Sequence, residues 1–384
     1  MSSVNIPFFR PSIDESDIAA VTETLRSGWL TTAGNVKAFE SELADYCGVP
    51  FVNAVNSATA ALHLALAAWD IGPGDEVITT PYTFCATANV IVHTGAQPVF
   101  VDVREQDFNI DAGRIEAAVT PRTRAIIPVH FAGEPCDMDT IGAIARRHNL
   151  KVLEDAAHAI GSMYRGRMVG GISDATAFSF YATKNMTTGE GGALATADPA
   201  LSERVRSLTL HGMNRDAWNR YDAGGSWRYD VAEFGFKDNL TDFAAALGRA
   251  QLTRLDGFME RRTGLVQRYF ANLRDEEHLI LPGFSEGNRQ AWHLFAVRVR
   301  NESAAVPRDD VIRKLSERGI QASVHFIPIH YFTAYRKLGL WQKGDFPVAE
   351  RIFEGAISLP LFPDMTDGEV DTVCEALRDI LHGR

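Results

Sequence analysis

Short apolar runs alternate with amphipathic stretches over roughly the first 200 residues of this chain. An apolar run of about four to six residues is typical of a buried strand, and apolar residues at helical spacing are typical of a helix that covers it. Strands joined by helices form a mainly parallel sheet with both faces covered. The chain is therefore predicted to be an α/β protein. The expected strands are residues 76–79, 98–103, 125–130, 151–154, 177–180 and 192–197, and expected helices include 58–69, 111–119 and 138–148.

A different pattern follows a long amphipathic stretch at residues 240–273. Residues 292–299 are strand-like and 308–318 are helix-like. At about 150 residues per domain, 384 residues correspond to two or three domains. We expect a large α/β domain over 1–250 and a smaller α+β domain over 251–384, with a loop at 223–226.

The charge balance and the cysteines exclude several classes of protein. Lys and Arg number 38 against 49 Asp and Glu, a formal net charge of −11, whereas nucleic acids and anionic membranes need a basic face. The cysteines are far apart and form no CxxC motif, so neither a metal site nor a disulfide framework is predicted. The N-terminus has no apolar signal core and no run reaches about 18 apolar residues, so the cytoplasm is the expected location.

Residues 56–61, Asn-Ser-Ala-Thr-Ala-Ala, place small and hydroxyl side chains at the start of a predicted helix. A helix N-terminus offers free N–H groups and the positive end of the helix dipole, and small residues let a phosphate approach them. The same residues suit an ordinary N-cap, because Ser and Thr are preferred there in any helix. Taken alone, the motif leaves both interpretations open.

An acidic residue, Asp155, directly follows the predicted strand 151–154. In an open α/β sheet, ligands bind beyond the carboxyl ends of the strands. A carboxylate flanked by alanines at such a place can lie under a ring nitrogen and keep it protonated. It equally suits a helix N-cap or a metal ligand, so its interpretation depends on the next motif.

Lys184 lies between the aromatic predicted strand 177–180 and a glycine-rich turn at 189–192, and lysines are only seven of the 38 basic residues. Desolvation there would lower the pKa of its amine and make it a nucleophile. A solvated surface lysine is the usual alternative, which the aromatic strand disfavours. A P-loop is disfavoured because the glycines follow the lysine, and no G-x-G-x-x-G follows the first strand, which argues against a nicotinamide enzyme.

A lysine that forms a Schiff base, an aspartate for a pyridinium nitrogen and a helix N-terminus for a phosphate make up the binding set for pyridoxal phosphate (PLP). With these residues the chain resembles the DegT/DnrJ/EryC1/StrS sugar aminotransferases of fold type I. The resemblance covers nearly the whole chain and implies a mainly parallel seven-stranded sheet in the large domain. The motifs that carry it are residues 27–32, 57–59, 83–89, 98–102, 154–158, 184–185, 189–192, 239–242 and 358–363.

The resemblance implies a role for each cofactor contact. Lys184 would form the Schiff base and move the proton of the reaction. Asp155 would pair with the pyridine nitrogen, Phe84 would stack on the ring, and His158, one helical turn after Asp155, would lie near the ring oxygen or the substrate. The implied phosphate contacts are Ser57, Ala58, Thr59 and Ser179.

The resemblance also implies a homodimer, because Asn239 would reach the cofactor phosphate from the partner subunit. His325 and His330 would face the sugar or its diphosphate, although two histidines five residues apart equally suit a loop anchored by hydrogen bonds. The remaining implied substrate contacts are Trp29 and Thr32, with Tyr181 and Lys237 as further candidates.

The implied reaction moves the amino group of L-glutamate, released as 2-oxoglutarate, to the keto carbon of a nucleotide-linked keto-sugar. Many family members carry Gln where this chain has His158. The histidine and residues 27–32 most resemble the branch that aminates carbon 4, such as the UDP-4-keto-pentose aminotransferase of lipid A modification, which would place the chain in lipopolysaccharide biosynthesis. The alternatives are amination at carbon 3, a sugar 3-dehydratase, against which Lys184 argues, and a non-catalytic regulatory or binding protein.

Overall fold

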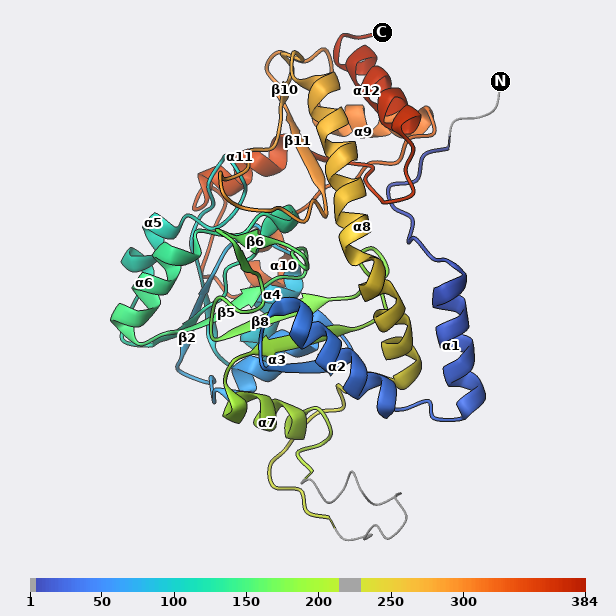
Figure 1. Ribbon diagram of the computed structural model, residues 1–384. Coiled ribbons are helices and arrows are strands. Elements are labelled where there is room, and N and C mark those ends of the chain that lie inside the picture. Colours follow the sequence, from blue (N-terminus) through green and yellow to red (C-terminus); the bar gives the residue numbers. More distant parts are fainter. Residues whose placement is uncertain (1–4, 214–228) are drawn as a thin grey trace.

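The main sheet of the protein has seven strands in the order β1-β9-β8-β5-β4-β2-β3. The computed structural model describes residues 5–213 and 229–384, so the loop expected at 223–226 lies outside the described residues (Figure 1). Only β9 runs antiparallel to its neighbours, which confirms the mainly parallel sheet. The strands are β1 (Phe51–Val55), β2 (Glu76–Thr79), β3 (Gln97–Phe100), β4 (Thr123–Ile126), β5 (Lys151–Asp155), β8 (Ala175–Ser179) and β9 (Gly192–Thr196).

Each strand expected in this sheet is present, and most end earlier than predicted because the chain leaves the sheet toward the carboxyl-end loops. The structure adds the edge strand β1, which the apolar pattern missed because Asn53 interrupts it. Asn53 is buried, and its amide is satisfied by α7 (Pro199–Leu208): Nδ2 donates to the Ser202 carbonyl at 3.3 Å, and Ser202 Oγ donates to Oδ1 at 3.0 Å.

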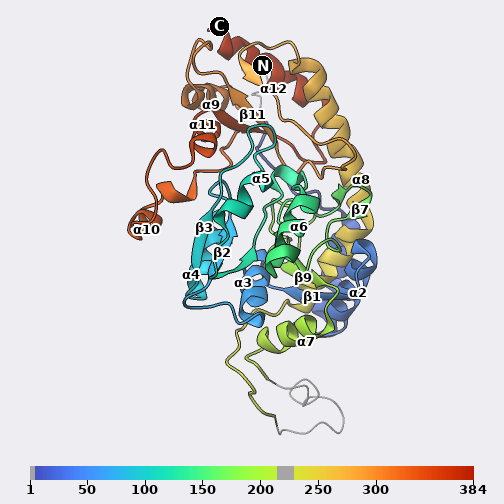
Figure 2. The same cartoon turned by 90° about the vertical axis from the view of Figure 1, so that its left-hand side faces the viewer.

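Helices cover both faces of the sheet (Figure 2). One apolar cluster joins the sheet to α3 (Ala58–Ala68), α4 (Cys85–His93) and α7. Two further clusters join the opposite face to α2 (Gly34–Cys47), α5 (Ala112–Ile115), α6 (Met138–His148) and the first half of α8 (Asp242–Leu273). The helix expected at 111–119 is thus shorter, since a 3-10 turn at Glu116–Ala118 follows α5.

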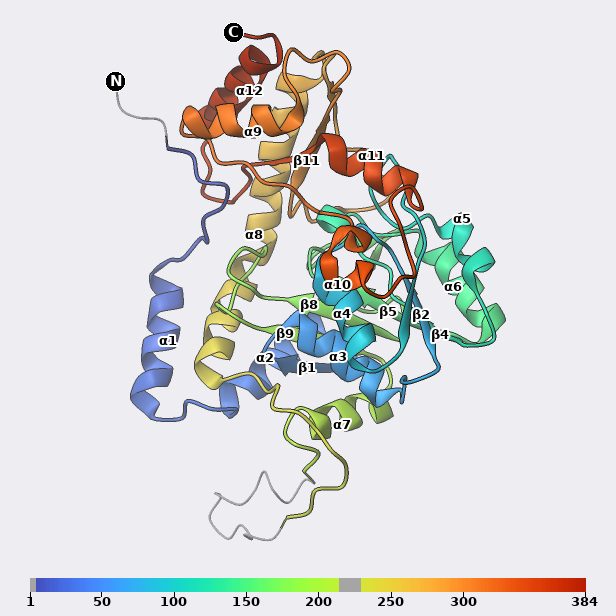
Figure 3. The same ribbon diagram turned by 180° about the vertical axis from the view of Figure 1, so that it is seen from behind.

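A second, three-stranded sheet packs with the C-terminal helices around its own apolar core. The elements of this region are β10 (Leu279–Ile280), β11 (Phe295–Val299), β12 (Ala356–Leu359), α9 (Arg308–Glu317), α11 (Pro347–Gly355) and α12 (Asp367–Leu381). Two smaller features are the hairpin β6 (Met163–Tyr164) and β7 (Arg167–Met168), and α10 (Thr333–Arg336). Figure 3 shows α10 beside α4, where Tyr335 Oη donates to Asn89 Oδ1 at 2.7 Å.

The helix α8 connects the two sheets. Its first half packs on α1 (Glu15–Ser27) and α2, and its second half packs on α12 (Figure 1). The boundary expected between residues 250 and 251 falls inside this continuous helix, so the division into two domains stays a prediction. Within the described residues, no helix combines the length and apolar character needed to cross a membrane.

Candidate active site

A cavity of about 430 Å³ lies at the carboxyl ends of the parallel strands. It is lined by Asp155 at the end of β5, Ser179 at the end of β8, and the first residues of α3 and α4. These are the places where an open α/β sheet binds its ligands.

Lys184 lines this cavity from the loop that follows β8. Its side chain is half-buried, because it opens onto the cavity while protein surrounds it. Burial lowers the pKa of the amine to about 8, and the Asp155 carboxylate opposes this shift by favouring the ammonium form. A substantial neutral fraction at physiological pH makes this amine a nucleophile and a base.

Asp155 is buried and held by hydrogen bonds. Thr87 Oγ1 donates to Asp155 Oδ2 at 2.7 Å, and the Ala157 N–H donates to Oδ1 at 3.2 Å. Thr83 Oγ1 lies 2.8 Å from Thr87 Oγ1, which extends the chain of hydrogen bonds. Burial raises the pKa of the Asp155 carboxyl, whereas Thr87, the Ala157 N–H and Lys184 lower it.

The N-terminus of α3 offers free amides to the cavity. Ser57 caps the helix by accepting the Ala60 N–H at 3.1 Å, while the N–H groups of Ala58 and Thr59 have no acceptor among the described residues. Gly192 packs against this turn: a Cβ there would lie 2.4 Å from Ser57 C and 2.5 Å from Ala58 N. The free amides and the positive helix end suit a phosphate.

Three imidazoles surround the rest of the cavity: His158, His293 and His325. Burial lowers the pKa of all three, to about 4 for His325, and the charge of Lys184 adds to this. They are neutral at pH 7. The His158 and His293 rings are 4.3 Å apart, and His158 Nδ1 is buried without a hydrogen-bond partner among the described residues.

The structure brings together most of the predicted site residues. The cavity lining contains Lys184, Asp155, Phe84, His158, Ser57, Ala58, Thr59, Ser179, His325 and the further candidate Tyr181. One local expectation is wrong: no helix follows Asp155, because residues 156–161 turn out of the sheet, and this turn carries His158 into the cavity.

Four predicted contacts, Asn239, Thr32, Trp29 and His330, and the further candidate Lys237 lie outside this lining. Asn239 Nδ2 donates to Thr32 Oγ1 at 2.7 Å, and Asn239 Oδ1 accepts a hydrogen bond from Lys237. Trp29 is exposed on the loop between α1 and α2. Asn239 and Thr32 are half-buried and already hydrogen-bonded within this chain.

The substrate role predicted for His330 is corrected by its position. His330 is buried, its Nε2 lies 2.9 Å from Glu350 Oε1 on α11, and its ring packs against Tyr331 and Phe346. It anchors its loop, which is the alternative that the spacing of the two histidines had left open.

The sequence did not predict Thr87 or His293 as site residues. Thr87 lies one helical turn after Thr83, and this spacing after the strand β2 is the signal that marks the pair. His293 is a lone histidine in an apolar stretch, which usually indicates a core residue; the fold turns it into the cavity, where its Nδ1 lies 3.1 Å from Asn185 Oδ1.

The cavity residues fit PLP. The Lys184 amine, whose pKa is lowered, suits the aldehyde of PLP, and the buried Asp155 carboxylate suits the ring nitrogen. The two free amides, next to a glycine with no room for a Cβ, suit the phosphate. The unpartnered imidazole nitrogen of His158 suits the ring oxygen. The fold and this site define an aminotransferase of fold type I.

Comparison with known proteins supports this assignment. Residues 11–378 match the DegT/DnrJ/EryC1/StrS aminotransferase family. The Bacillus subtilis spore coat polysaccharide biosynthesis protein SpsC is 51% identical over 379 residues, which cover 98% of this chain and 97% of SpsC. The chain belongs to this family and is a PLP-dependent enzyme, which confirms the resemblance seen in the sequence.

Solved structures share the whole fold. The PMP form of Spr1654 from Streptococcus pneumoniae is 37% identical with a TM-score of 0.92, and the match covers 98% of this chain and 99% of that one. PseC from Helicobacter pylori, an aminotransferase involved in pseudoaminic acid biosynthesis, is 30% identical with a TM-score of 0.91 over 98% and 99% of the two chains.

Proposed function

We propose that this protein transfers the amino group of L-glutamate to the keto carbon of a nucleotide-linked keto-sugar. The observation that carries the proposal is the placement of Lys184, Asp155 and the free amides of α3 around one cavity. The sugar substrate is supported by the relatives, since SpsC serves spore coat polysaccharide biosynthesis and PseC serves pseudoaminic acid biosynthesis.

Each residue has a distinct task in this proposal. PLP supplies an electron sink and carries the amino group. Lys184 Nζ would take the proton from the carbon on one side of the transferred nitrogen and return it to the carbon on the other side, which its neutral fraction permits. Asp155 would keep the ring nitrogen protonated, and Phe84 would stack on the ring. Neutral His158 offers Nδ1 to the ring oxygen or the substrate.

The remaining phosphate contacts would come from Ser57, Ala58, Thr59 and Ser179, which line the same end of the cavity. We further propose that the protein acts as a cytoplasmic homodimer in which Asn239 reaches the partner's cofactor phosphate. Trp29 and Thr32 would contact the sugar from the same surface. His325 would face the substrate, because its ring lines the cavity while its Nδ1 lies 2.9 Å from Ser358 Oγ.

The proposed position of amination is carbon 4, on the basis of His158 and residues 27–32. The proposed pathway is the synthesis of an amino sugar for a surface polysaccharide, a class to which both lipopolysaccharide and the spore coat polymer of SpsC belong.

This proposal can be tested by incubating the holoenzyme and L-glutamate with a panel of nucleotide-linked sugars. The panel contains 3-keto and 4-keto sugars linked to UDP, dTDP and GDP. We expect one nucleotide 4-keto sugar to be converted, with NMR locating the new amine on carbon 4. An amine on carbon 3 would refute the regiochemistry alone. PLP binding without amination of any sugar would instead support the non-catalytic alternative.

A further inference from the structure

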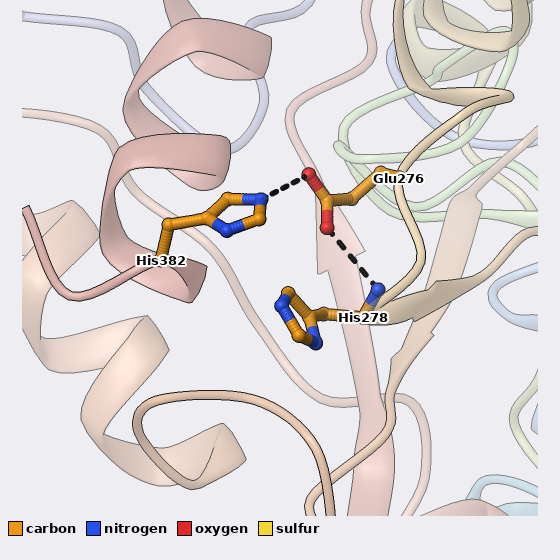
Figure 4. Close-up of side chains that lie close together, drawn as sticks. All are labelled: Glu276, His278 and His382. Atoms are coloured by element: carbon orange, nitrogen blue, oxygen red, sulfur yellow. Dashed lines mark hydrogen bonds and ion pairs between the residues drawn. The ribbon is translucent and has the colours of Figure 1, made fainter.

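A cluster of metal-ligating side chains lies far from the cavity, in the region of the second sheet. Glu276 and His278 lie in the turn between α8 and β10, and His382 follows the last residue of α12 (Figure 4). One ligand atom from each lies within 4.8 Å of the others. The sequence analysis predicted no metal site, and more than one hundred residues separate His382 from the other two along the chain.

The Glu276 carboxylate lacks a permanent counter-charge. Its side chain is 3% exposed, its Oε1 accepts the His278 N–H at 3.1 Å, and its Oε2 lies 3.2 Å from His382 Nε2. Among the described residues no Lys or Arg forms an ion pair with it. Buried carboxylates in proteins are paired with a cation or coordinate a metal.

His382 Nε2 contacts this carboxylate, and a ring nitrogen of His278 lies within 4.8 Å of the ligand atoms of the other two residues. His278 Nδ1 lies 3.1 Å from Ser303 Oγ, so the hydroxyl fixes the ring and leaves Nε2 as the free ligand atom. The His278 and His382 rings are 4.8 Å apart. Glu277 Oε1 lies 4.0 Å from His278 Nε2 on the exposed side of the cluster.

We propose that Glu276, His278 and His382 bind a divalent transition-metal ion of the zinc class. Zinc lies about 2.0–2.2 Å from imidazole nitrogen and carboxylate oxygen in tetrahedral sites, so its ligand atoms are about 3.3–3.6 Å apart. Glu276 Oε2 and His382 Nε2 already have nearly this separation. The ligand atom of His278 lies within 4.8 Å of these two, so binding of the ion would require the ring to move closer by about 1 Å.

The ligand set selects the kind of ion. Two imidazoles and one carboxylate suit Zn²⁺ and its neighbours, whereas Ca²⁺ and Mg²⁺ prefer oxygen ligands. The fourth coordination position opens toward Glu277 and solvent. An ion bound by these three residues ties the end of α12 to the turn after α8. Its role is therefore structural and independent of the aminotransferase reaction.

Titration of the tag-free, PLP-loaded protein with ZnCl₂ tests the proposal by calorimetry. We expect one ion per chain at this site, and an affinity lowered at least about tenfold in His382→Ala and His278→Ala. His382 is exposed and follows the last helix, so its replacement leaves the apolar core unchanged. The matched control is His148→Ala. His148 is another surface histidine, and its Nε2 lies 3.0 Å from Glu116 Oε1. Its replacement should leave zinc binding unchanged.

Hydrogen exchange provides a second readout that does not depend on activity. Zinc should slow exchange at the C-terminal end of α12 in the wild type and in His148→Ala, but not in His382→Ala. Absence of binding, or equal binding by the wild type and both ligand variants, would overturn the metal site. Neither result bears on PLP binding or on sugar amination, which are measured separately.

Discussion

The amine of Lys184 is the group on which the chemistry depends, and its pKa can be measured. Reductive methylation of the PLP-free protein with ¹³C-formaldehyde labels the lysines for NMR, and Lys184→Arg identifies the relevant signal. We expect that signal to titrate near pH 8 because of burial. Asp155→Asn should lower this pKa further, since the carboxylate stabilises the ammonium form. A pKa that stays near 10.5 would contradict the buried setting.

Thr87 positions Asp155 through a hydrogen bond of 2.7 Å. Thr87→Val keeps the shape of the side chain but removes the donor, so the pKa of Asp155 should rise and the carboxylate should hold the ring nitrogen less well. Loss of a hydrogen bond to a charged group costs about 1.5–3 kcal/mol, or about tenfold or more in PLP affinity measured by fluorescence titration. Thr87→Ser retains the hydroxyl and should bind PLP normally; equal loss in both variants would argue against this role.

Lys184 and Asp155 were predicted from their positions after apolar strands, whereas most of the other site residues were implied by the family resemblance. Asp155 directly follows the predicted strand 151–154 and Lys184 lies in the loop after the predicted strand 177–180, and their combination indicated the PLP site. Thr87 and His293 act through contacts between distant segments, and His330 differs from its predicted role only because Glu350 happens to face it. Such pairings depend on how α4, α11 and β11 pack, which no local pattern encodes.

Residue 192, where β9 packs against the start of α3, must be glycine. In Gly192→Ala the new methyl would lie within 2.5 Å of Ser57 C and Ala58 N, so it must push the phosphate-binding turn away. We expect a loss of PLP affinity of about tenfold or more by the same titration. Gly257→Ala on α8 is the control: nothing lies within 4 Å of its Cβ, and it should stabilise the helix slightly without changing PLP binding.

Asp242, at the start of α8, caps a different helix. Its carboxylate accepts the N–H groups of Ala33, Asn35 and Val36 at 2.9–3.2 Å, which satisfies the start of α2. Since the side chain is buried, Asp242→Ala should lower stability by about 2–3 kcal/mol and reduce the apparent Tm of the PLP-free protein. Asp198→Ala removes the exposed cap of α7 and should cost about 1 kcal/mol. Equal Tm values for the two variants would refute the capping role.

The elements themselves were predicted well where the pattern was continuous, as in the apolar runs of β2 and β5 and the amphipathic stretch of α8. The edge strand β1 was missed because the partner that satisfies Asn53 comes from α7, about 150 residues later. The boundary between the two sheets was placed inside α8, since helical periodicity does not reveal where one helix changes its packing partners.

For the molecule as a whole, the cavity is short of positive charge. The proposed ligands carry phosphates, the chain has a net charge of −11, and Lys184 is the only Lys or Arg in the lining that the structure describes. The phosphates of the ligands must therefore be bound by amides, hydroxyls and groups from outside this lining. A second copy of the chain is the proposed source, with Asn239 as its contact.

Subunit complementation tests that arrangement. Lys184→Ala and Asn239→Ala homodimers should both be poorly active, whereas mixing and reassociating them should restore about a quarter of the wild-type activity. Half of the dimers are then mixed, and each contains one site with both native residues. If Asn239 serves the cavity of its own chain instead, every site in the mixture lacks one residue and no activity returns.

The central claim is that Lys184, which lines this cavity together with Asp155, moves the proton of the amino-transfer reaction. The most direct test is a single-turnover experiment without any sugar. It measures the release of 2-oxoglutarate from L-glutamate by the PLP-loaded protein. The wild type should release about one equivalent per site, and Lys184→Ala, loaded with PLP to the same extent, should lose at least about a hundredfold in rate. Release by Lys184→Ala at the wild-type rate would contradict the claim.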